Sequence, residues 1–435
     1  MKLKGLRSRD LWWFSVPSIV ASVFEPLASV VDTALVGHLD RESLAALALA
    51  VAVFNAITWM FNFLVHTSTQ AIADHEAGKN LELLRSRIKI SLSLALLVGL
   101  SCSLVLWLPQ DLWFEISGGI PKLRVLFDEY FSPRVGFHVF TVLSITLLSI
   151  LRGFGRLKLV LWLMIASTVC NILLSWLFLY PMNLGLKGAA YGTIAAHVAT
   201  SLLGLYFLFQ DEKLRQGFLK SKVLKGQWLK FGKSSFDMFG RSFILTLCFF
   251  SSTRFASRLG VDALGAHQVL LQVWLLASFF LDGLAITGNI LGARFFFAGH
   301  FKRTSVAFRE LLKLGLFVGI AFFFFYGIFW HKVVQLFVED QTVLEQLYLL
   351  KWPIVISQVF SAVAFVFDGL IFGLNGFSFL RKHMFIGALL TYIPLSLVSF
   401  LYPDLIWIWA GMITLNAYRG LSGYYYVRKK VFSKV

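Results

Sequence analysis

Long apolar segments recur along this whole 435-residue chain, and they constrain its fold more than any other feature. A helix needs about 20 mainly apolar residues to cross a bilayer. We predict twelve such helices, centred near residues 23, 57, 95, 142, 168, 196, 247, 276, 317, 363, 390 and 413. Hydrophobic residues make up 58% of the chain and charged residues only 14%, whereas soluble domains have about 25% charged residues. The sequence therefore predicts an all-α polytopic membrane protein.

Basic residues are concentrated in alternate loops between these segments. Of the 40 Lys and Arg residues, 29 lie in the two tails and in five loops that fall on one side. The opposite loops and helix ends hold only eight. Because Lys and Arg are enriched in cytoplasmic loops, we predict a multi-pass protein of the cell inner (plasma) membrane with both termini cytoplasmic. This topology also explains the net charge of +17, so we expect no nucleic-acid partner.

The sequence predicts two halves joined by a basic linker. Residues 211–233 form the longest basic loop, so we predict a six-helix lobe at 1–210, a linker at 211–233 and a second six-helix lobe at 234–435. Sliding the chain on itself by 220 residues pairs Gly153 with Gly373 and "LVGL" with "FVGI". An even number of helices per repeat gives halves of the same orientation. Two bundles related by a pseudo-two-fold axis along the membrane normal are a transporter architecture.

The first apolar segment contains two carboxylates, and a charged group in hydrocarbon costs several kcal/mol of free energy. Glu25 and Asp32 are seven residues apart, hence on one helix face and about 10 Å from each other. Ionisable residues inside a membrane usually mark pathways or proton relays. Pro17 and Pro26 favour a kink in the same helix. We therefore predict that Asp32, with Glu25, is a proton-exchange site on a helix that bends.

Further polar residues follow helical spacing in the N-terminal half. These could line one polar cavity together with Asp32: Asn55, Asn62 and His66 in the second segment, Asn171 and Ser175 in the fifth, and Thr193 and His197 in the sixth. Hydrogen bonding between helices is an alternative use of such side chains.

A different polar cluster is expected in the C-terminal half. Asp237 and Arg241 are four residues apart, so they can pair along one helix face, as a buried charge requires. Asp282 and Asp368 lie deep in apolar segments, and either could pair with Arg241 or Arg254, or titrate in a wet cavity.

Enzyme and cofactor signatures are missing from the sequence. We find no nucleotide-binding, hydrolase or zinc-protease motif and no cluster of His and Cys residues that predicts a metal site. We therefore expect a transporter driven by an ion gradient, without a cofactor, and not an enzyme.

Three segments resemble a known family. The stretches "EPLASVVDTALVGHL", "RFASRLGVDALGAHQVLLQVWLLASFFLDGLAI" and "FVFDGLIFG" resemble the multidrug and toxic compound extrusion (MATE) family, within it the DinF-like branch. The resemblance covers essentially the whole chain. It implies a V-shaped antiporter that expels cationic, amphipathic compounds in exchange for H⁺ or Na⁺. We also expect a monomer.

Particular residues match the family pattern. Asp32 matches the first-helix aspartate that couples to protons, and Pro17 the proline at which bending has been proposed. Asn171 and Thr193 match polar residues of the N-lobe cavity, and Asp368 an aspartate of sodium-coupled relatives.

Other positions depart from the pattern. Ser175 and Leu148 replace an aspartate and an asparagine of proton-coupled relatives, so Asp32 acts nearly alone or with Glu25. Arg241 stands near a glutamate of sodium-coupled relatives, which favours protons, and the role of Asn289 is open.

Two other functions compete with proton-driven drug export. One is a sodium-coupled exporter that uses Asp368. The other is a flippase for a lipid-linked or endogenous metabolite, which would need a basic cavity. Arg241 and Arg254 are the only cationic candidates for such a cavity.

Overall fold

The protein is helical throughout the part that the computed structural model describes. That part is residues 8–37, 39, 41–61, 63–78, 80–117, 119–223, 225–338 and 340–434, and it contains no β-strand. Eleven of the twelve predicted centres lie in α-helices: α1 (Ser8–Gly37), α2 (Arg41–Met60), α4 (Leu81–Trp107), α7 (His138–Gly153), α8 (Leu157–Leu179), α9 (Leu186–Phe209), α11 (Lys225–Arg258), α12 (Val261–Phe297), α13 (Phe301–Gln335), α15 (Lys351–Gly373) and α18 (Leu405–Lys430). Residue 390 lies in η2 (Ala388–Tyr392), a π-helical turn between α16 (Phe377–Gly387) and α17 (Ile393–Val398).

Seven helical segments of the described residues are long and apolar enough to cross a membrane, or eight if a bent pair counts as one. The bent pair joins Pro121–Gly136 to His138–Gly153 at an angle of 52°. Side chains such as Phe317, Phe324 and Ile328 on α13 are large, apolar and exposed, as expected of a surface that contacts lipid.

Two compact units make up the chain. The N-terminal unit is Val23–Ser235, and the C-terminal unit is Met1–Ser22 with Phe236–Val435. Helices α1 and α11 therefore each contribute to both units. The basic linker 211–233 belongs to the N-terminal unit, and the division into two lobes with a separate linker stays a prediction.

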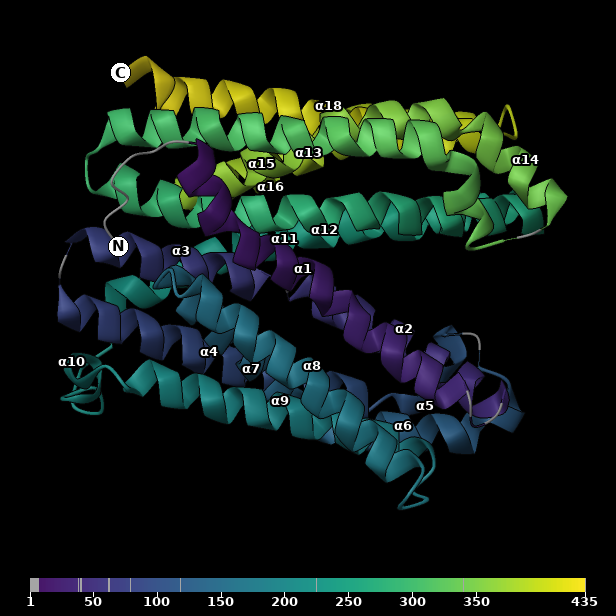
Figure 1. Ribbon diagram of the computed structural model, residues 1–435, viewed down its shortest axis with the longest axis horizontal. Helices are drawn as coiled ribbons and strands as arrows, with labels where there is room; N and C mark the ends of the chain where they lie inside the picture. The colour runs from purple at the N-terminus through teal and green to yellow at the C-terminus, as the bar shows by residue number, and fades with distance from the viewer. Residues whose placement is uncertain are drawn as a thin grey trace. The chain divides into compact units, whose positions relative to one another are not determined.

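In the N-terminal unit, α8 packs along α9, and α7 packs against α4, α9 and α3 (Phe63–Gly78) (Figure 1). Helix α6 (Arg124–Gly136) packs against α9 and α2. Short helices α5 (Gln110–Ile116), η1 (Pro121–Leu123) and α10 (Glu212–Arg215) complete the unit. The apolar core between α2, α6 and α9 includes Phe54, Phe127 and Phe131, with ring centroids of the last two 4.7 Å apart.

Side chains of α4 hold the linker against the N-terminal unit. Lys89 donates from Nζ to the carbonyl oxygens of Leu219 (3.1 Å) and Ser221 (2.6 Å), and Arg85 donates to that of Gln216. Lys89 also lies over the ring of Phe218. These bonds satisfy linker carbonyl groups that have no helical partner.

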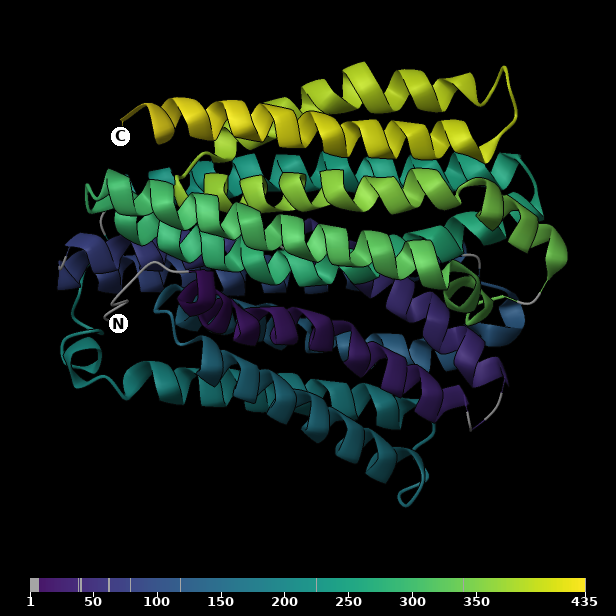
Figure 2. The same ribbon diagram turned by 45° about the horizontal axis from the view of Figure 1, so that its top comes forward.

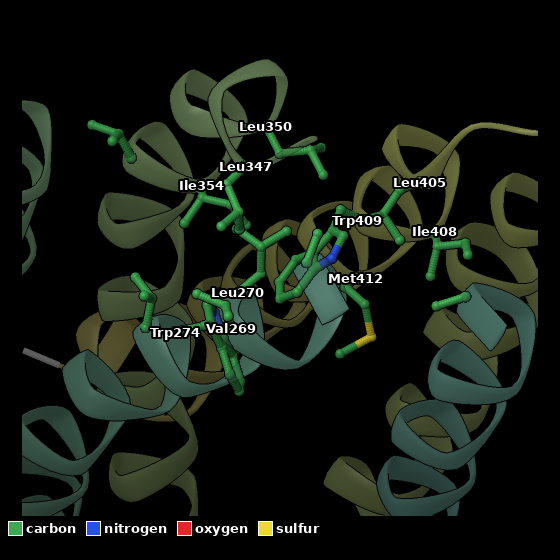
Figure 3. Close-up of a cluster of buried hydrophobic side chains, with 14 of the residues drawn as sticks. Val269, Leu270, Trp274, Leu347, Leu350, Ile354, Leu405, Ile408, Trp409 and Met412 are labelled. Carbon is green, nitrogen blue, oxygen red and sulfur yellow. The ribbon is translucent and has the colours of Figure 1, made fainter. Parts of the chain in front are cut away.

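In the C-terminal unit, α12, α13, α15 and α18 run alongside one another in both ribbon views (Figure 2). A large apolar cluster of this unit joins α12, α14 (Gln341–Leu349), α15 and α18 around Trp274 and Trp409 (Figure 3). Helices α12 and α15 touch at backbone distance, because a Cβ on Gly369 would lie 2.3 Å from the Cα of Ala285. Such small residues let membrane helices pack closely. The unit ends in η3 (Phe432–Lys434).

Candidate functional site

Asp32 is the centre of a buried polar network in the N-terminal unit. Its Oδ2 lies 3.2 Å from Oγ1 of Thr193 on α9 and 3.4 Å from Nδ2 of Asn171 on α8. Asn171 Nδ2 also lies 3.1 Å from Thr193 Oγ1 and 3.5 Å from Ser175 Oγ. The structure thus brings Asp32, Asn171, Ser175 and Thr193 together from α1, α8 and α9, four residues that the sequence predicts to share a site.

The network has fewer hydrogens than acceptors. Thr193 has one hydroxyl hydrogen, but its Oγ1 lies within reach of both Asp32 Oδ2 and the carbonyl oxygen of Ala189, 3.0 Å away. Asn171 has two amide hydrogens for three acceptors. Which bonds form must therefore depend on whether Asp32 is ionised, since an ionised carboxylate only accepts hydrogen bonds and a protonated one also donates.

Two oxygen atoms of the network lack a partner. Asp32 Oδ1 and Asn171 Oδ1 are buried and make no hydrogen bond with the described residues. An unsatisfied buried acceptor costs about 1–3 kcal/mol. Both atoms are acceptors, so the site is suited to a proton or a cationic group.

A glycine sets the distance between the two helices that hold this network. A Cβ on Gly192 of α9 would lie 2.3 Å from Oγ and 2.6 Å from the backbone nitrogen of Ser175 on α8. No substituent fits there unless the helices separate. Thr193 follows Gly192 directly, so such a separation would also pull Thr193 away from Asn171.

We expect Gly192→Ala to lower both thermal stability and transport. The clash should cost roughly 1–3 kcal/mol, although alanine favours a helix over glycine by about 1 kcal/mol. Gly232→Ala on α11 is the matched control, since nothing lies within 4 Å of its Cβ position. Melting temperature and ethidium transport of the two variants test this; equal stability would show that α8 and α9 separate at no cost.

The other predicted residues of the N-terminal half have different surroundings. Asn55 is exposed, and His66 is half-buried. His197 on α9 is half-buried, and its Nδ1 lies 3.1 Å from Ser144 Oγ on α7. The place of these three residues in one cavity with Asp32 stays a prediction.

Some predictions for the first two segments fall outside the described part. Asn62 and the side chains of Glu25 and Pro26 are not in it. Helix α1 continues without interruption through Pro17, whose side chain is buried. A kink at Pro17 or Pro26 and a role for Glu25 thus stay predictions.

An arginine and a tyrosine near the Asp32 network were missed by the sequence analysis. Arg134, near the end of α6, donates from Nη1 to Tyr130 Oη at 2.7 Å, and its guanidinium lies 4.7 Å from the ring centroid of Phe54. Tyr130 is fully buried and interacts with Thr193, and Arg134 acts electrostatically on Asp32. Arg134 is placed among the loops and helix ends in the sequence analysis, because a single sequence does not show that α6 folds back onto α9.

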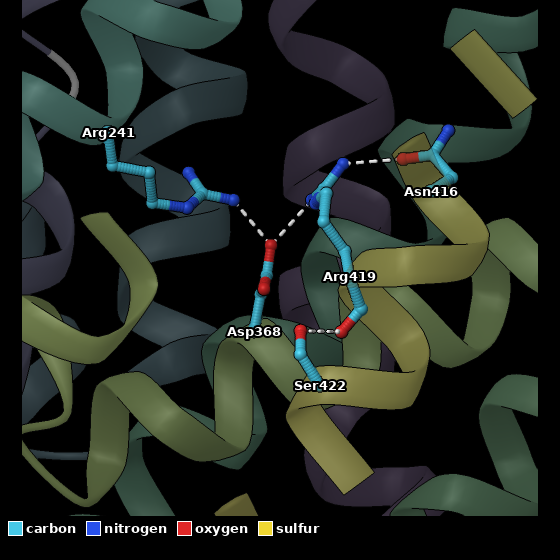
Figure 4. A network of polar contacts seen from close by, with 5 residues as sticks. All are labelled: Arg241, Asp368, Asn416, Arg419 and Ser422. Carbon is cyan, nitrogen blue, oxygen red and sulfur yellow. Dashed lines mark hydrogen bonds and ion pairs between the residues drawn. The ribbon is translucent and has the colours of Figure 1, made fainter. Parts of the chain in front are cut away.

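The C-terminal cluster corrects the predicted pairing of Asp237 with Arg241. Asp237 Oδ1 instead accepts from Nε of Arg381 on α16, at 2.9 Å. Arg241 donates from Nη2 to Asp368 Oδ2 on α15 (Figure 4). Asp237 and Arg241 each pair with a residue on another helix instead of with each other, because the pair between Arg241 and Asp368 also satisfies the buried Asp368 carboxylate.

Asp368 accepts a second guanidinium, that of Arg419 on α18. Arg419 Nη2 donates to the same Oδ2, and its Nη1 donates to Asn416 Oδ1 at 2.6 Å (Figure 4). Asp368, Arg241 and Arg419 are 4%, 8% and 6% exposed. The Asp368–Arg241 pair is one of the alternatives that the sequence left open, whereas the contact of Arg419 was missed. Asp368 thus joins α11, α15 and α18.

Asp282 and Arg254 complete the predicted set. Asp282 on α12 is half-buried and acts electrostatically on Arg241, while Arg254 on α11 is exposed. Asn289 is buried, and its role stays open. Among the described residues no group of three or more His, Cys, Asp or Glu side chains could hold a metal ion.

Comparison with known proteins now identifies the family. The MatE family model matches the chain twice, at residues 17–177 and 238–398. The chain belongs to the MatE family. Its members are transporters, so the chain is a multi-pass membrane transporter built from two MatE repeats. The resemblance to MATE proteins is thereby confirmed.

Relatives of the MatE protein include a plant and a bacterial sequence. Protein DETOXIFICATION 44, chloroplastic, of Arabidopsis thaliana is 27% identical over 432 residues, which cover 96% of this chain and 82% of that protein. DNA damage-inducible protein F of Escherichia coli (strain K12) is 25% identical over 420 residues, 95% of this chain and 90% of that protein. The crystal structure of MATE in the bent conformation has a TM-score of 0.89 at 20% identity and covers 98% of this chain and 96% of that one. This likeness confirms the two-lobe all-α fold.

Proposed function

We propose that this transporter exports cationic lipophilic compounds in exchange for protons, with Asp32 as the carboxylate that binds the proton. The observation that carries the proposal is the buried Asp32 network, with its unpartnered Oδ1 and its surplus of acceptors. The Arabidopsis relative is named for detoxification, which agrees with export of foreign compounds.

One carboxylate can exchange a proton for a cation because it binds only one of them at a time. Burial disfavours the ionised form, so the group takes up a proton unless a cation compensates its charge. A cationic substrate at Asp32 would bind the ionised form and release the proton. A proton from the other side of the membrane would then displace the substrate.

The hydrogen-bond network offers a way to link this exchange to conformation. When Asp32 is ionised, the Thr193 hydroxyl can donate to Oδ2; when Asp32 is protonated, Asp32 can donate to Thr193, whose hydrogen then turns to the Ala189 carbonyl. The bonds between α1, α8 and α9 thus differ in the two states. A ligand shifts a conformational equilibrium only through such differential contacts.

Sodium coupling at Asp368 fits the contacts less well. A sodium ion would have to compete with two guanidinium groups that already donate to the same carboxylate oxygen. Breaking a buried pair costs about 3–5 kcal/mol. Proton coupling at Asp32 needs no such break, since no Lys or Arg of the described residues forms a salt bridge with Asp32.

The proposal includes the protein's surroundings. We place it as a monomer in the cell inner (plasma) membrane with both termini cytoplasmic, on the distribution of basic residues. Its partners would be H⁺, amphipathic cations and membrane lipid.

Ethidium transport in proteoliposomes tests the coupling ion. We expect a pH gradient alone to drive ethidium movement against its gradient, and a sodium gradient alone to leave it at the rate of protein-free liposomes. Transport driven by sodium at constant pH would contradict proton coupling. No transport under either gradient would contradict the choice of cationic substrate.

A further inference from the structure

We propose that His197 is a second proton-binding group of the N-terminal unit, which receives the proton from the Asp32 network on its way to the cytoplasm. The inference rests on the proposed proton coupling at Asp32. It starts from the hydrogen bonds of the histidine and from its position on α9.

The contacts of Ser144 fix where the proton of a neutral His197 lies. Ser144 Oγ lies 2.8 Å from the carbonyl oxygen of Thr141 and 3.1 Å from His197 Nδ1. A hydroxyl has one hydrogen, and a carbonyl can only accept, so both contacts are bonds only when His197 Nδ1 carries a hydrogen. Nδ1 then donates to Ser144, and Ser144 donates to Thr141.

This assignment leaves Nε2 of His197 as a basic atom. Nε2 has no hydrogen-bond partner in the part of the chain that the structure describes, and His197 is half-buried as a residue. Protonation at Nε2 breaks neither bond of the Ser144 chain. The imidazole can therefore gain and lose a proton at fixed geometry, which a relay group requires.

His197 lies next to the Asp32 network on the same helix face. Thr193, which contacts Asp32, precedes it by four residues, one turn of α9 and about 6 Å along the axis. Residues four apart on a helix are neighbours on one face, so the two side chains are adjacent along α9. In the proposed topology α9 runs toward the cytoplasm, so His197 lies on the cytoplasmic side of Thr193.

Charged groups lie on the helices around His197. Arg134 on α6 and His138 at the start of α7 act electrostatically on its imidazole. On α8 the only charged residue is Lys158, at the start of the helix, and α10 places Glu212 and Arg215 beyond the far end of α9.

The transfer step balances as a proton exchange between two bases. The O–H bond of protonated Asp32 breaks, and an N–H bond forms at His197 Nε2, which leaves a carboxylate and an imidazolium. The imidazolium then loses the same proton to cytoplasmic water. No electron transfer or further reactant is involved.

His197→Gln separates proton transfer from substrate movement. Glutamine can still donate to Ser144 but does not titrate. In proteoliposomes we expect ethidium transport driven by a pH gradient to fall about tenfold, or 1.4 kcal/mol in barrier height. Exchange of ethidium for ethidium at equal pH, which needs no net proton movement, should stay close to that of the wild type.

Two controls keep the interpretation unambiguous. Ser144→Ala keeps the imidazole but removes the bond that fixes its tautomer, so pH-driven transport should fall less than in His197→Gln, while exchange of ethidium for ethidium should persist. The histidine ¹⁵N NMR spectrum should show a titrating Nε2 that His197→Gln removes. A purely structural role would lower both transport modes in both variants, and unchanged pH-driven transport in His197→Gln would also overturn the relay. Persistence of proton-driven transport in Asp32→Asn would instead contradict the proposed function itself.

Discussion

Asp32→Asn is expected to abolish proton-driven export while the protein still folds. The amide keeps the size of the side chain and can still bond with Thr193 and Asn171, but it neither takes up a proton nor attracts a cation. Loss of a positioned proton-transfer group costs at least about a hundredfold in rate, so ethidium transport under a pH gradient should fall to the level of protein-free liposomes. A melting temperature near that of the wild type would exclude unfolding as the cause.

Matched variants of the same network distinguish the carboxylate from its neighbours. Thr193→Val removes the hydroxyl that lies between Asp32 and the Ala189 carbonyl, yet keeps the shape of the side chain. We expect this variant to retain slower proton-driven transport. Ser175→Ala should have a smaller effect than Asp32→Asn, because the serine hydroxyl only supports the carboxylate and lies 3.5 Å from Asn171 Nδ2. If Thr193→Val and Asp32→Asn were equally inactive, the hydroxyl would be as essential as the carboxylate.

Asp368→Ala is expected to be among the most destabilising single changes in the C-terminal unit. It leaves Arg241 and Arg419 buried without their shared carboxylate. Removal of one partner of a buried ion pair costs about 3–5 kcal/mol. The variant should show a clearly lower melting temperature in detergent, together with low yield.

Two further variants test this explanation. Asp237→Ala is the matched control, because its partner Arg381 is 36% exposed and can turn to solvent; its loss should be much smaller. Asp368→Leu combined with Arg241→Met and Arg419→Met should recover much of the stability, since apolar replacements remove the uncompensated charges. A stable Asp368→Ala protein that had lost only sodium-dependent transport would contradict this account and support sodium coupling at Asp368.

Much of the fold could be predicted from the sequence, because bilayer thickness sets the length of an apolar helix that crosses the membrane. The Asp32 network was also predictable in part: Asn171 and Ser175 are four residues apart, so they share a face of one helix. The partner of Arg241 was misjudged because helical spacing reveals neighbours on the same helix, not which helices approach each other. Arg419 and Arg134 were missed for that reason, as were the hydroxyl of Ser144 and its bond to His197.

Proton release on substrate binding tests the central claim most directly. Purified protein in weakly buffered detergent solution is mixed with ethidium, and a pH indicator reports the protons that leave. Exchange at Asp32 predicts that the wild type releases protons as ethidium saturates its site, and that Asp32→Asn releases none. Equal proton release by Asp32→Asn, or saturable binding by the wild type without any release, would contradict the account.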